Sequence, residues 1–288
     1  MIRLAMPNKG RLQQPTLDLI RTAGLAFETT DRALSVTARN ADVELLFVRT
    51  EDVPELVSDG VADLGITGQD LLAEFGAGLE VLAELAYGHC HLAAAVPTGS
   101  AAAKVEDLAG MRVATAHPRA TSRFFDGRNI EVTVVPLRGS VEVATKLGVA
   151  DAIVDLVSTG STLTVNGLRE VGVVLASQAV LVAAGPNEAS GADAPFSGAA
   201  GRVATAIKAV VAGRRKRYLL LNAPSHAVGT ISTLIPGLEA PTVVPLADYG
   251  MVAIHSVVGA DDIWNLLPLL EEAGGTGILV LPIDQLVP

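Results

Sequence analysis

The first half of the chain alternates short, mostly apolar segments of strand length with segments whose apolar residues recur at helical spacing. Strands buried on both faces read as continuous apolar runs, and helices between them indicate parallel βαβ units. The runs typical of strands are residues 2–6, 43–48, 62–67, 87–96, 112–115 and 131–135. Helices are predicted over residues 12–23 and 52–58, after Pro118, and from a Ser140 cap to Gly148. The pattern predicts an α/β fold.

The composition changes between Gly185 and Gly201, where small residues and proline follow no apolar period. This is typical of a linker. Beyond it, strands are predicted over residues 217–222, 241–246, 251–258 and 276–282, and helices over 225–234 and 260–273. The resulting βαββαβ order is that of a ferredoxin-like domain, which by itself indicates no particular function.

The segment DLVSTGSTLT, Asp155 to Thr164, follows an apolar run that begins at Ala150. Loops at the carboxyl ends of parallel strands line the ligand crevice of open α/β sheets. Small residues there allow backbone N–H groups and hydroxyls to converge on one anion. The predicted anion-binding positions are Ser158, Thr159, Gly160, Ser161 and Thr162. A solvated surface turn has the same composition, so these residues alone leave both interpretations open.

Three acids are expected near this loop: Asp155 at its start, Asp151 before it and Glu142 in the helix after Ser140. Carboxylates beside an anion site need another task, such as accepting hydrogen bonds from sugar hydroxyls or binding a divalent cation. The combination points to a phosphorylated sugar. Singly, Glu142 can be a favourable charge at a helix N-terminus and Asp151 a solvent-facing residue.

Basic residues gather near other predicted strand ends. Lys9 and Arg11 flank a glycine after the first strand, Arg49 follows the strand at 43–48, and Arg32 lies between them. They can face the acidic half across a cleft, although each alone reads as an ordinary surface charge.

Composition limits the function classes. A formal charge of −10 argues against general binding to nucleic acid or anionic membranes. The single cysteine, Cys90, excludes an internal disulfide, and His89 with His91 lacks a third ligand at metal spacing, so no zinc site is assigned. The N-terminus does not read as a signal peptide and no apolar stretch reaches membrane-span length, so a cytoplasmic protein is expected.

The segment EVATKLGVADAIVDLVSTGSTL, from Glu142 to Leu163, resembles the signature of the ATP phosphoribosyltransferase family, which begins histidine biosynthesis. NKGRL near the N-terminus, DVPELVSDGVADLGITGQD, LRGSVE and PGLEAPTVVPLA support the resemblance over essentially the whole chain. The C-terminal extension resembles the long form of the family. His117 and His91 depart from the family's usual residues at those positions, tyrosine and a basic or small residue.

The resemblance implies a two-lobed catalytic core, similar to type II periplasmic binding proteins, followed by a ferredoxin-like βαββαβ regulatory domain. The implied boundaries are residues 1–92 with 179–212 for the first lobe, 93–178 for the second lobe and 213–288 for the regulatory domain.

The resemblance also implies the reaction, in which N1 of ATP displaces pyrophosphate from 5-phosphoribosyl 1-pyrophosphate with Mg²⁺ as cofactor. Residues 158–162 match the 5-phosphate loop, Glu142 and Asp155 the acids near the ribose and the metal, and Arg49, Arg32, Lys9 and Arg11 the basic positions of the cleft. The resemblance further implies that histidine is an allosteric inhibitor. It also implies an oligomeric state in which dimers assemble into hexamers.

Two other classes remain open. A non-catalytic two-lobed protein that senses a small anion would close on its ligand without turnover, but it leaves the acids without a task. A scaffold protein ranks third, because it leaves the clustered loop chemistry unexplained.

Overall fold

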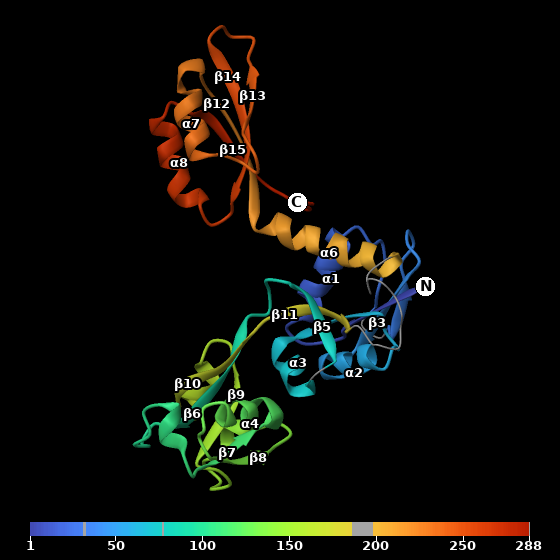
Figure 1. Cartoon of the computed structure of the whole chain (residues 1–288), viewed down its shortest axis with the longest axis vertical. Coiled ribbons are helices and arrows are strands. Elements are labelled where there is room, and N and C mark those ends of the chain that lie inside the picture. The colour runs from blue at the N-terminus through green and yellow to red at the C-terminus, as the bar shows by residue number, and fades with distance from the viewer. Residues whose placement is uncertain (31–32, 77, 186–197, 288) are drawn as a thin grey trace. The chain divides into compact units, whose positions relative to one another are not determined.

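The computed structural model describes residues 1–30, 33–76, 78–185 and 198–287, and Figure 1 traces its elements. The chain divides into two compact units. The first contains Met1–Asp18 and Leu25–Ala204, and the second contains Leu19–Gly24 and Thr205–Pro288. The residue boundaries predicted for the three domains stay a prediction.

The first lobe is built on a six-stranded sheet in the order β2-β3-β1-β4-β11-β5. From Leu4 to Pro7, strand β1 is apolar and buried, because parallel neighbours, β3 and β4, flank it. The strands are β1 (Ile2–Pro7), β2 (Ser35–Thr37), β3 (Val43–Val48), β4 (Leu64–Gly68), β5 (Leu79–Glu84) and β11 (Ala179–Ala184), and the helices are α1 (Gln13–Thr22), 3₁₀ helix η1 (Thr50–Asp52), α2 (Val53–Ser58) and α3 (Gln69–Phe75).

The second lobe has a five-stranded sheet in the order β10-β6-β9-β7-β8. Helix α4 begins with Pro118 at its first position, where the missing N–H costs nothing. The elements are β6 (Cys90–Pro97), η2 (Val105–Leu108), β7 (Arg112–Thr115), α4 (Pro118–Asp126), β8 (Thr133–Pro136), η3 (Val141–Val143), β9 (Ala152–Val157), α5 (Ser161–Val165) and β10 (Leu168–Ser177).

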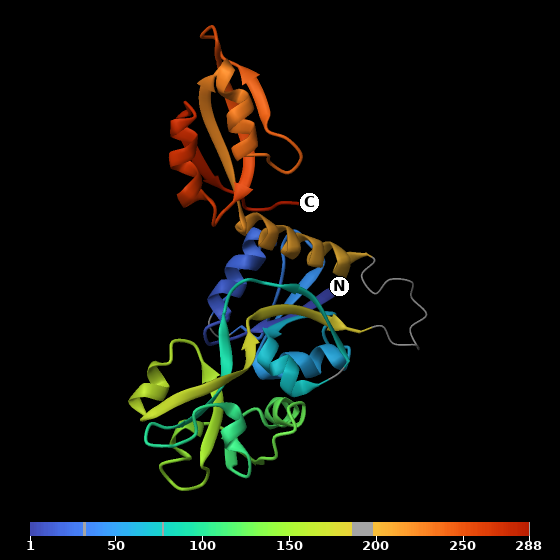
Figure 2. The same cartoon turned by 60° about the vertical axis from the view of Figure 1, so that its left-hand side comes forward.

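The two lobes repeat one arrangement, as the orders β3-β1-β4-β11-β5 and β8-β7-β9-β6-β10 show. In each, a central strand has two parallel neighbours, and an antiparallel strand arrives from the other lobe. The crossings are residues 85–89, before β6, and Gln178, between β10 and β11 (Figure 1 and Figure 2). This confirms the predicted two-lobed core of the type II periplasmic-binding-protein class.

The C-terminal sheet has the order β13-β14-β12-β15, and with its helices it confirms the predicted ferredoxin-like topology. Figure 1 shows α7 and α8 on one face of this sheet, where alternate residues of β14 are buried. The elements are α6 (Ala199–Arg214), β12 (Lys216–Pro224), η4 (Ser225–Ala227), α7 (Val228–Leu234), β13 (Thr242–Pro245), β14 (Met251–Gly259), α8 (Ile263–Glu272) and β15 (Thr276–Pro282).

Two sequence predictions near the acidic loop were wrong in detail. The helix expected from Ser140 to Gly148 is only the 3₁₀ helix η3, and Ser140 adopts a left-handed conformation without a side-chain cap bond. Residues 144–150 continue as hydrogen-bonded turns. The strand preceding the loop runs to Val157, so Asp155 lies within β9 rather than at the start of the loop.

Candidate functional site

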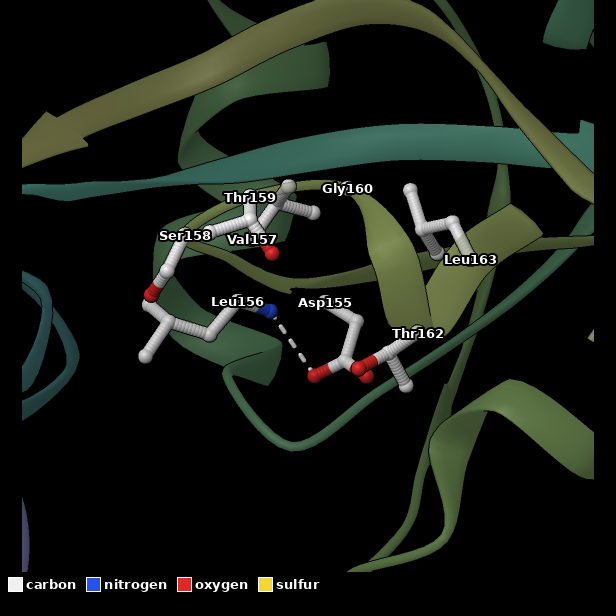
Figure 3. Close-up of a pocket in the computed structure, with 8 residues that line it drawn as sticks. All are labelled: Asp155, Leu156, Val157, Ser158, Thr159, Gly160, Thr162 and Leu163. Atoms are coloured by element: carbon white, nitrogen blue, oxygen red, sulfur yellow. Dashed lines mark hydrogen bonds between the residues drawn. The ribbon is translucent and has the colours of Figure 1, made fainter. Parts of the chain in front are cut away.

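A pocket of about 120 Å³ lies where β9 ends and α5 begins. A water molecule needs only about 10–15 Å³ of such space, so the pocket accepts a much larger group. Figure 3 shows its lining: Asp155, Leu156, Val157, Ser158, Thr159, Gly160, Thr162 and Leu163. The structure therefore brings together most of the predicted loop residues, and Ser161 lies next to them in α5.

Gly160 turns the chain from the loop into α5. Its φ of 76° lies in the left-handed region, which an L side chain rarely adopts. A Cβ at this position would meet no atom within 4 Å, so the need for glycine is conformational rather than steric. Helix α5 starts at the next residue, and the first N–H groups of a helix have no intrahelical acceptor. Such groups are suited to anions.

The hydroxyls of the loop are divided between internal bonds and the pocket. Thr159 and Ser161 share a hydrogen bond of 2.9 Å between their side-chain oxygens. Arg11 of the first lobe donates from Nη1 to Ser158 Oγ at 3.0 Å. Figure 3 shows the side chains of Asp155 and Thr162 on the same side of the loop. The pocket wall thus combines the half-buried carboxylate of Asp155 with exposed hydroxyl side chains on both sides of Gly160.

Asp155 is a partly buried carboxylate in β9. Burial raises its pKa most, and the negative charge of Glu142 raises it further. A hydrogen bond from the Leu156 backbone N–H, 2.8 Å long, and the charge of His117 act in the opposite direction. Asp155 and Glu142 therefore repel each other across a short range, which a cation or donor hydroxyl between them would relieve.

The basic residues of the first lobe lie at strand ends, as predicted. Pro7 of β1 is opposite Val48 of β3 in the parallel register, so Lys9 and Arg49 follow neighbouring strands at one edge of the sheet. Arg11 reaches the second lobe, where it contacts Ser158 and also donates from Nη2 to Cys90 Sγ at 2.7 Å. Arg32 lies outside the described residues.

Sequence reasoning missed a buried cluster of Asp70, Ser177 and His117, here called the Asp70 cluster. Ser177 Oγ donates to Asp70 Oδ1 at 2.6 Å and accepts from the Asp70 backbone N–H at 3.0 Å. His117 Nε2 lies 3.5 Å from Asp70 Oδ2, within ion-pair range but long for a hydrogen bond. Burial alone would raise the pKa of Asp70, but the interactions with His117 and Ser177 hold it below its ordinary value.

Beside this cluster, helices α3 and α4 join the lobes. The Glu74 carboxylate accepts the backbone N–H groups of Arg119 and Ala120 at 3.1 and 3.0 Å, so it caps the N-terminus of α4. In return, Arg119 donates to the Phe75 carbonyl at 2.9 Å, and Arg123 donates to the Ala73 carbonyl. An acid two residues after a buried strand, as in Asp70, was a recognisable sequence signal, whereas nothing in the sequence pairs Glu74 with α4.

Asp151 does not belong to the site, and its prediction there was wrong. It lies before β9, six strand residues from the loop, which corresponds to about 20 Å of extended chain. Its carboxylate forms an exposed ion pair with Arg112, 2.9 Å between Oδ1 and Nη2, and this guanidinium holds the pKa of Asp151 below its ordinary value. The ion pair with Arg112 therefore accounts for Asp151 without a role in the pocket.

Asp155 and Glu142 are the oxygen donors that could hold a metal ion. Among the described residues, no three His, Cys, Asp or Glu side chains gather as a complete metal site. Mg²⁺ commonly uses one or two carboxylates and takes its other ligands from water and substrate phosphates. The Asp155 carboxylate in the pocket wall, with Glu142 near enough to raise its pKa, fits that mode of binding. His91 is engaged elsewhere, with its Nε2 at 3.1 Å from Glu170 Oε2.

Within the described part of the chain, no helix has the length and apolar character needed to span a membrane.

Comparison with known proteins gives concordant matches. A family model described as ATP phosphoribosyltransferase matches residues 49–198, and one described as HisG, C-terminal domain, matches residues 213–285. An ATP phosphoribosyltransferase of Gemmatimonas aurantiaca is 42% identical over 293 aligned residues, which cover all of both chains. That of Cytophaga hutchinsonii is 40% identical and covers 100% of this chain and 99% of its own.

A solved structure gives the same result. The ATP phosphoribosyl transferase (HisG:HisZ) complex from Thermotoga maritima contains a chain similar to this one with a TM-score of 0.55 and 30% identity. The match covers 64% of this chain and 88% of that one.

Proposed function

The chain belongs to the ATP phosphoribosyltransferase family, and from this premise we propose that the pocket between β9 and α5 holds the phosphoribosyl group of 5-phosphoribosyl 1-pyrophosphate. The observation that carries the assignment is the junction of Asp155 with the loop Ser158–Thr162, where a carboxylate and an anion-suited turn line one pocket. The 5-phosphate occupies the loop, and the ribose hydroxyls donate to Asp155 and Glu142.

In the reaction, N1 of the ATP adenine forms a bond to C1 of the ribose as the bond from C1 to pyrophosphate breaks. The pyrophosphate takes the bonding electrons, so positive charge develops on the ribose in the transition state. Holding both substrates in line is a large part of such catalysis, and the protein needs no covalent nucleophile. Asp155 and Glu142 orient the ribose, and their negative charge stabilises the developing cation.

Basic residues at the facing edge of the first lobe stabilise the leaving pyrophosphate. Lys9 and Arg49 follow adjacent strands there, and Arg11 already reaches across to Ser158. Arg32 is assigned to the same role from the family resemblance alone. Asp155 and Glu142 would hold Mg²⁺ together with substrate oxygens, and the ion would supply charge neutralisation there. Chelation of Mg²⁺ is therefore expected to abolish turnover.

Regulation is assigned to the ferredoxin-like domain. Residues 213–285 match the family's C-terminal domain, which supports histidine as an allosteric inhibitor that binds there. Coupling between two such sites is typically about 1–3 kcal/mol, or roughly 5–150-fold in affinity. Assembly of dimers into hexamers is part of the same proposal, and the cytoplasmic location stays a prediction. Initial rates of the full chain with and without histidine test the inhibition.

The deciding experiment mixes the full chain with ATP, phosphoribosyl pyrophosphate and Mg²⁺ and follows release of pyrophosphate and formation of the nucleotide adduct. Both products are expected in equal amounts, and omission of either substrate should abolish them. Binding of phosphoribosyl pyrophosphate without any release would instead favour the non-catalytic anion sensor.

A further inference from the structure

His117 carries a buried polar atom that the fold leaves without a partner. The residue is 8% exposed, and its Nδ1 has no hydrogen-bond partner among the described residues. Buried polar atoms are nearly always satisfied, so an exception in a native structure calls for a ligand, an ordered water or a strained contact. The rest of His117 is well held, because its backbone N–H donates to Thr115 Oγ1 at 3.0 Å and its Nε2 faces Asp70.

The repeat of the two lobes gives the orphan atom a counterpart. Asn8 Oδ1 is likewise buried and unpartnered among the described residues. Asn8 directly follows β1, and His117 comes two residues after β7. Strands β1 and β7 hold the same place in the two lobes, each between two parallel neighbours. Two unsatisfied atoms at matching strand ends are what a ligand bound between two related lobes would need.

The sheet register places His117 beside the proposed substrate pocket. Strand β7 pairs in parallel with β9, and Thr115 lies opposite Val154. Two residues beyond Thr115, the chain that leaves β7 reaches His117. Two residues beyond Val154, β9 has passed Asp155 and reached Leu156. The charge of His117 acts to lower the pKa of Asp155, which agrees with this register.

We propose that His117 is a substrate-binding residue whose Nδ1 forms a hydrogen bond with an oxygen of the pentose-phosphate substrate held against Asp155. The inference rests on the function proposed above. Asp70 acts as a positioning residue, because its carboxylate faces Nε2 and so directs the opposite ring nitrogen toward the substrate. The 3.5 Å separation between Nε2 and Asp70 is expected to shorten in the substrate complex, as such contacts often do.

Two amide substitutions separate this role from a structural one. His117→Gln extends an amide toward the position of Nε2, which keeps a polar partner for Asp70 but removes the group at Nδ1. His117→Asn places an amide near Nδ1 and gives up the contact with Asp70. A substrate hydrogen bond predicts that the Gln variant is the more damaged of the two. A purely structural link to Asp70 predicts the reverse order.

The measurement is the KM for each substrate, with the full chain and the other substrate saturating, together with the melting temperature. For His117→Gln, the KM for phosphoribosyl pyrophosphate is expected to rise about tenfold, the usual cost of one lost hydrogen bond to a charged or polar group. For His117→Asn it should rise less than about threefold by the same reasoning. The KM for ATP should stay unchanged in both variants.

The proposal is overturned if His117→Asn is the more damaging, or if both variants change both KM values equally and lower the melting temperature together. Should neither variant fold, Asp70→Asn is measured in the same way, because it keeps the side-chain volume and an acceptor for Ser177. A KM for phosphoribosyl pyrophosphate that is unaltered in this folded variant would exclude the positioning role and with it the proposal.

Wild-type turnover keeps this test distinct from that of the function. If the wild type releases pyrophosphate and the two His117 variants match it, only the His117 assignment fails. If the wild type shows no turnover, the function fails, and calorimetric titration of phosphoribosyl pyrophosphate into the same three proteins decides about His117. Weaker binding to the Gln variant supports the role, and equal binding or none excludes it.

Discussion

Asp155 in β9 and Asp70 in the first turn of α3 are carboxylates of neighbouring lobes, and their pKa values shift in opposite directions. Asp70 is almost fully buried, yet Ser177 and His117 satisfy it and lower its pKa. Asp155 is less buried, but its pKa is raised, mainly by that burial and further by Glu142, because only the Leu156 N–H and the charge of His117 oppose the shift. Burial raises both pKa values, and the hydrogen-bond partners of each carboxylate decide whether that rise is overcome.

The difference separates a group satisfied by the fold from one that awaits a partner. The Asp70 cluster lies beside the α3–α4 contact, where each helix supplies caps for the other. The pocket between β9 and α5 offers a carboxylate, exposed hydroxyls and a left-handed glycine to open space. Substitution of Asp70 should therefore lower stability and, through His117, weaken phosphoribosyl pyrophosphate binding, whereas substitution of Asp155 should lower turnover without loss of stability.

The largest effect is expected for Asp155→Asn. The amide keeps the size of the side chain but removes the charge that faces the ribose, so kcat should fall about a hundredfold or more, as for loss of a transition-state charge partner. Steady-state kinetics measures this loss. Near-normal kinetics would remove Asp155 from the site.

The same variant should not lose stability. A carboxyl whose pKa is raised by folding opposes folding as it ionises, so its cost appears as the pH rises above about 4 and is complete above the raised pKa. Asp155→Asn is therefore expected to melt at or above the wild-type temperature at pH 7 without ligand. A lower melting temperature would mean that interactions within the folded protein stabilise the ionised carboxylate of Asp155.

Asp70→Asn should show the opposite behaviour. It removes the ionic acceptor of Ser177 and the charge facing His117, which should lower the free energy of unfolding by about 2 kcal/mol. Since folding lowers the pKa of Asp70, its stabilising effect is present above about pH 4 and is lost as the pH falls through the lower folded value. Urea titrations at pH 7 and near pH 3 should show the difference shrinking in acid; a difference independent of pH would contradict the ionised state.

Gly160→Ala tests the loop with a matched control. Gly160 and Gly148 both have positive φ, 76° and 68°, and a Cβ at either would meet nothing within 4 Å. Each substitution should cost about 1 kcal/mol of stability from backbone strain. Only Gly160→Ala should raise the KM for phosphoribosyl pyrophosphate, by several-fold, and leave that for ATP unchanged. Equal kinetic effects of the two variants would argue against a phosphate loop.

The smallest effect is expected for Asp151→Asn. Its partner Arg112 is exposed, and exposed ion pairs contribute little because solvent screens them. Turnover should match the wild type within experimental error. A large loss of kcat would return Asp151 to the site and would make its exclusion here wrong.

Sequence patterns predicted the fold better than the contacts between lobes. Short, mostly apolar segments located β3 and β7 at the residues where the structure has them, because strands of a covered sheet are rich in aliphatic residues. The prediction of a helix starting at Ser140 was wrong, because the backbone of Ser140 is left-handed and a regular α-helix does not start from that conformation. Residue types indicated the small-residue loop that lines the pocket, but they placed Asp155 at the start of the loop rather than within β9, and Asp151 looked equivalent until its partner Arg112 was seen.

The Asp70 cluster shows why part of the site escaped prediction. Asp70, His117 and Ser177 lie far apart in the chain and come together only through the register of separate sheets and the crossing at Gln178. A hydrogen bond that links residues 107 positions apart leaves no periodic trace in the sequence. Contacts of this kind follow from tertiary structure alone.

Amide hydrogen exchange of the full chain with phosphoribosyl pyrophosphate and Mg²⁺ tests the location of the substrate most directly. Exchange should slow in peptides covering residues 156–163 and change much less in peptides covering 69–75, whose groups the fold already satisfies. Unchanged exchange over residues 156–163, while calorimetry shows that the substrate is bound, would contradict the assignment of this pocket.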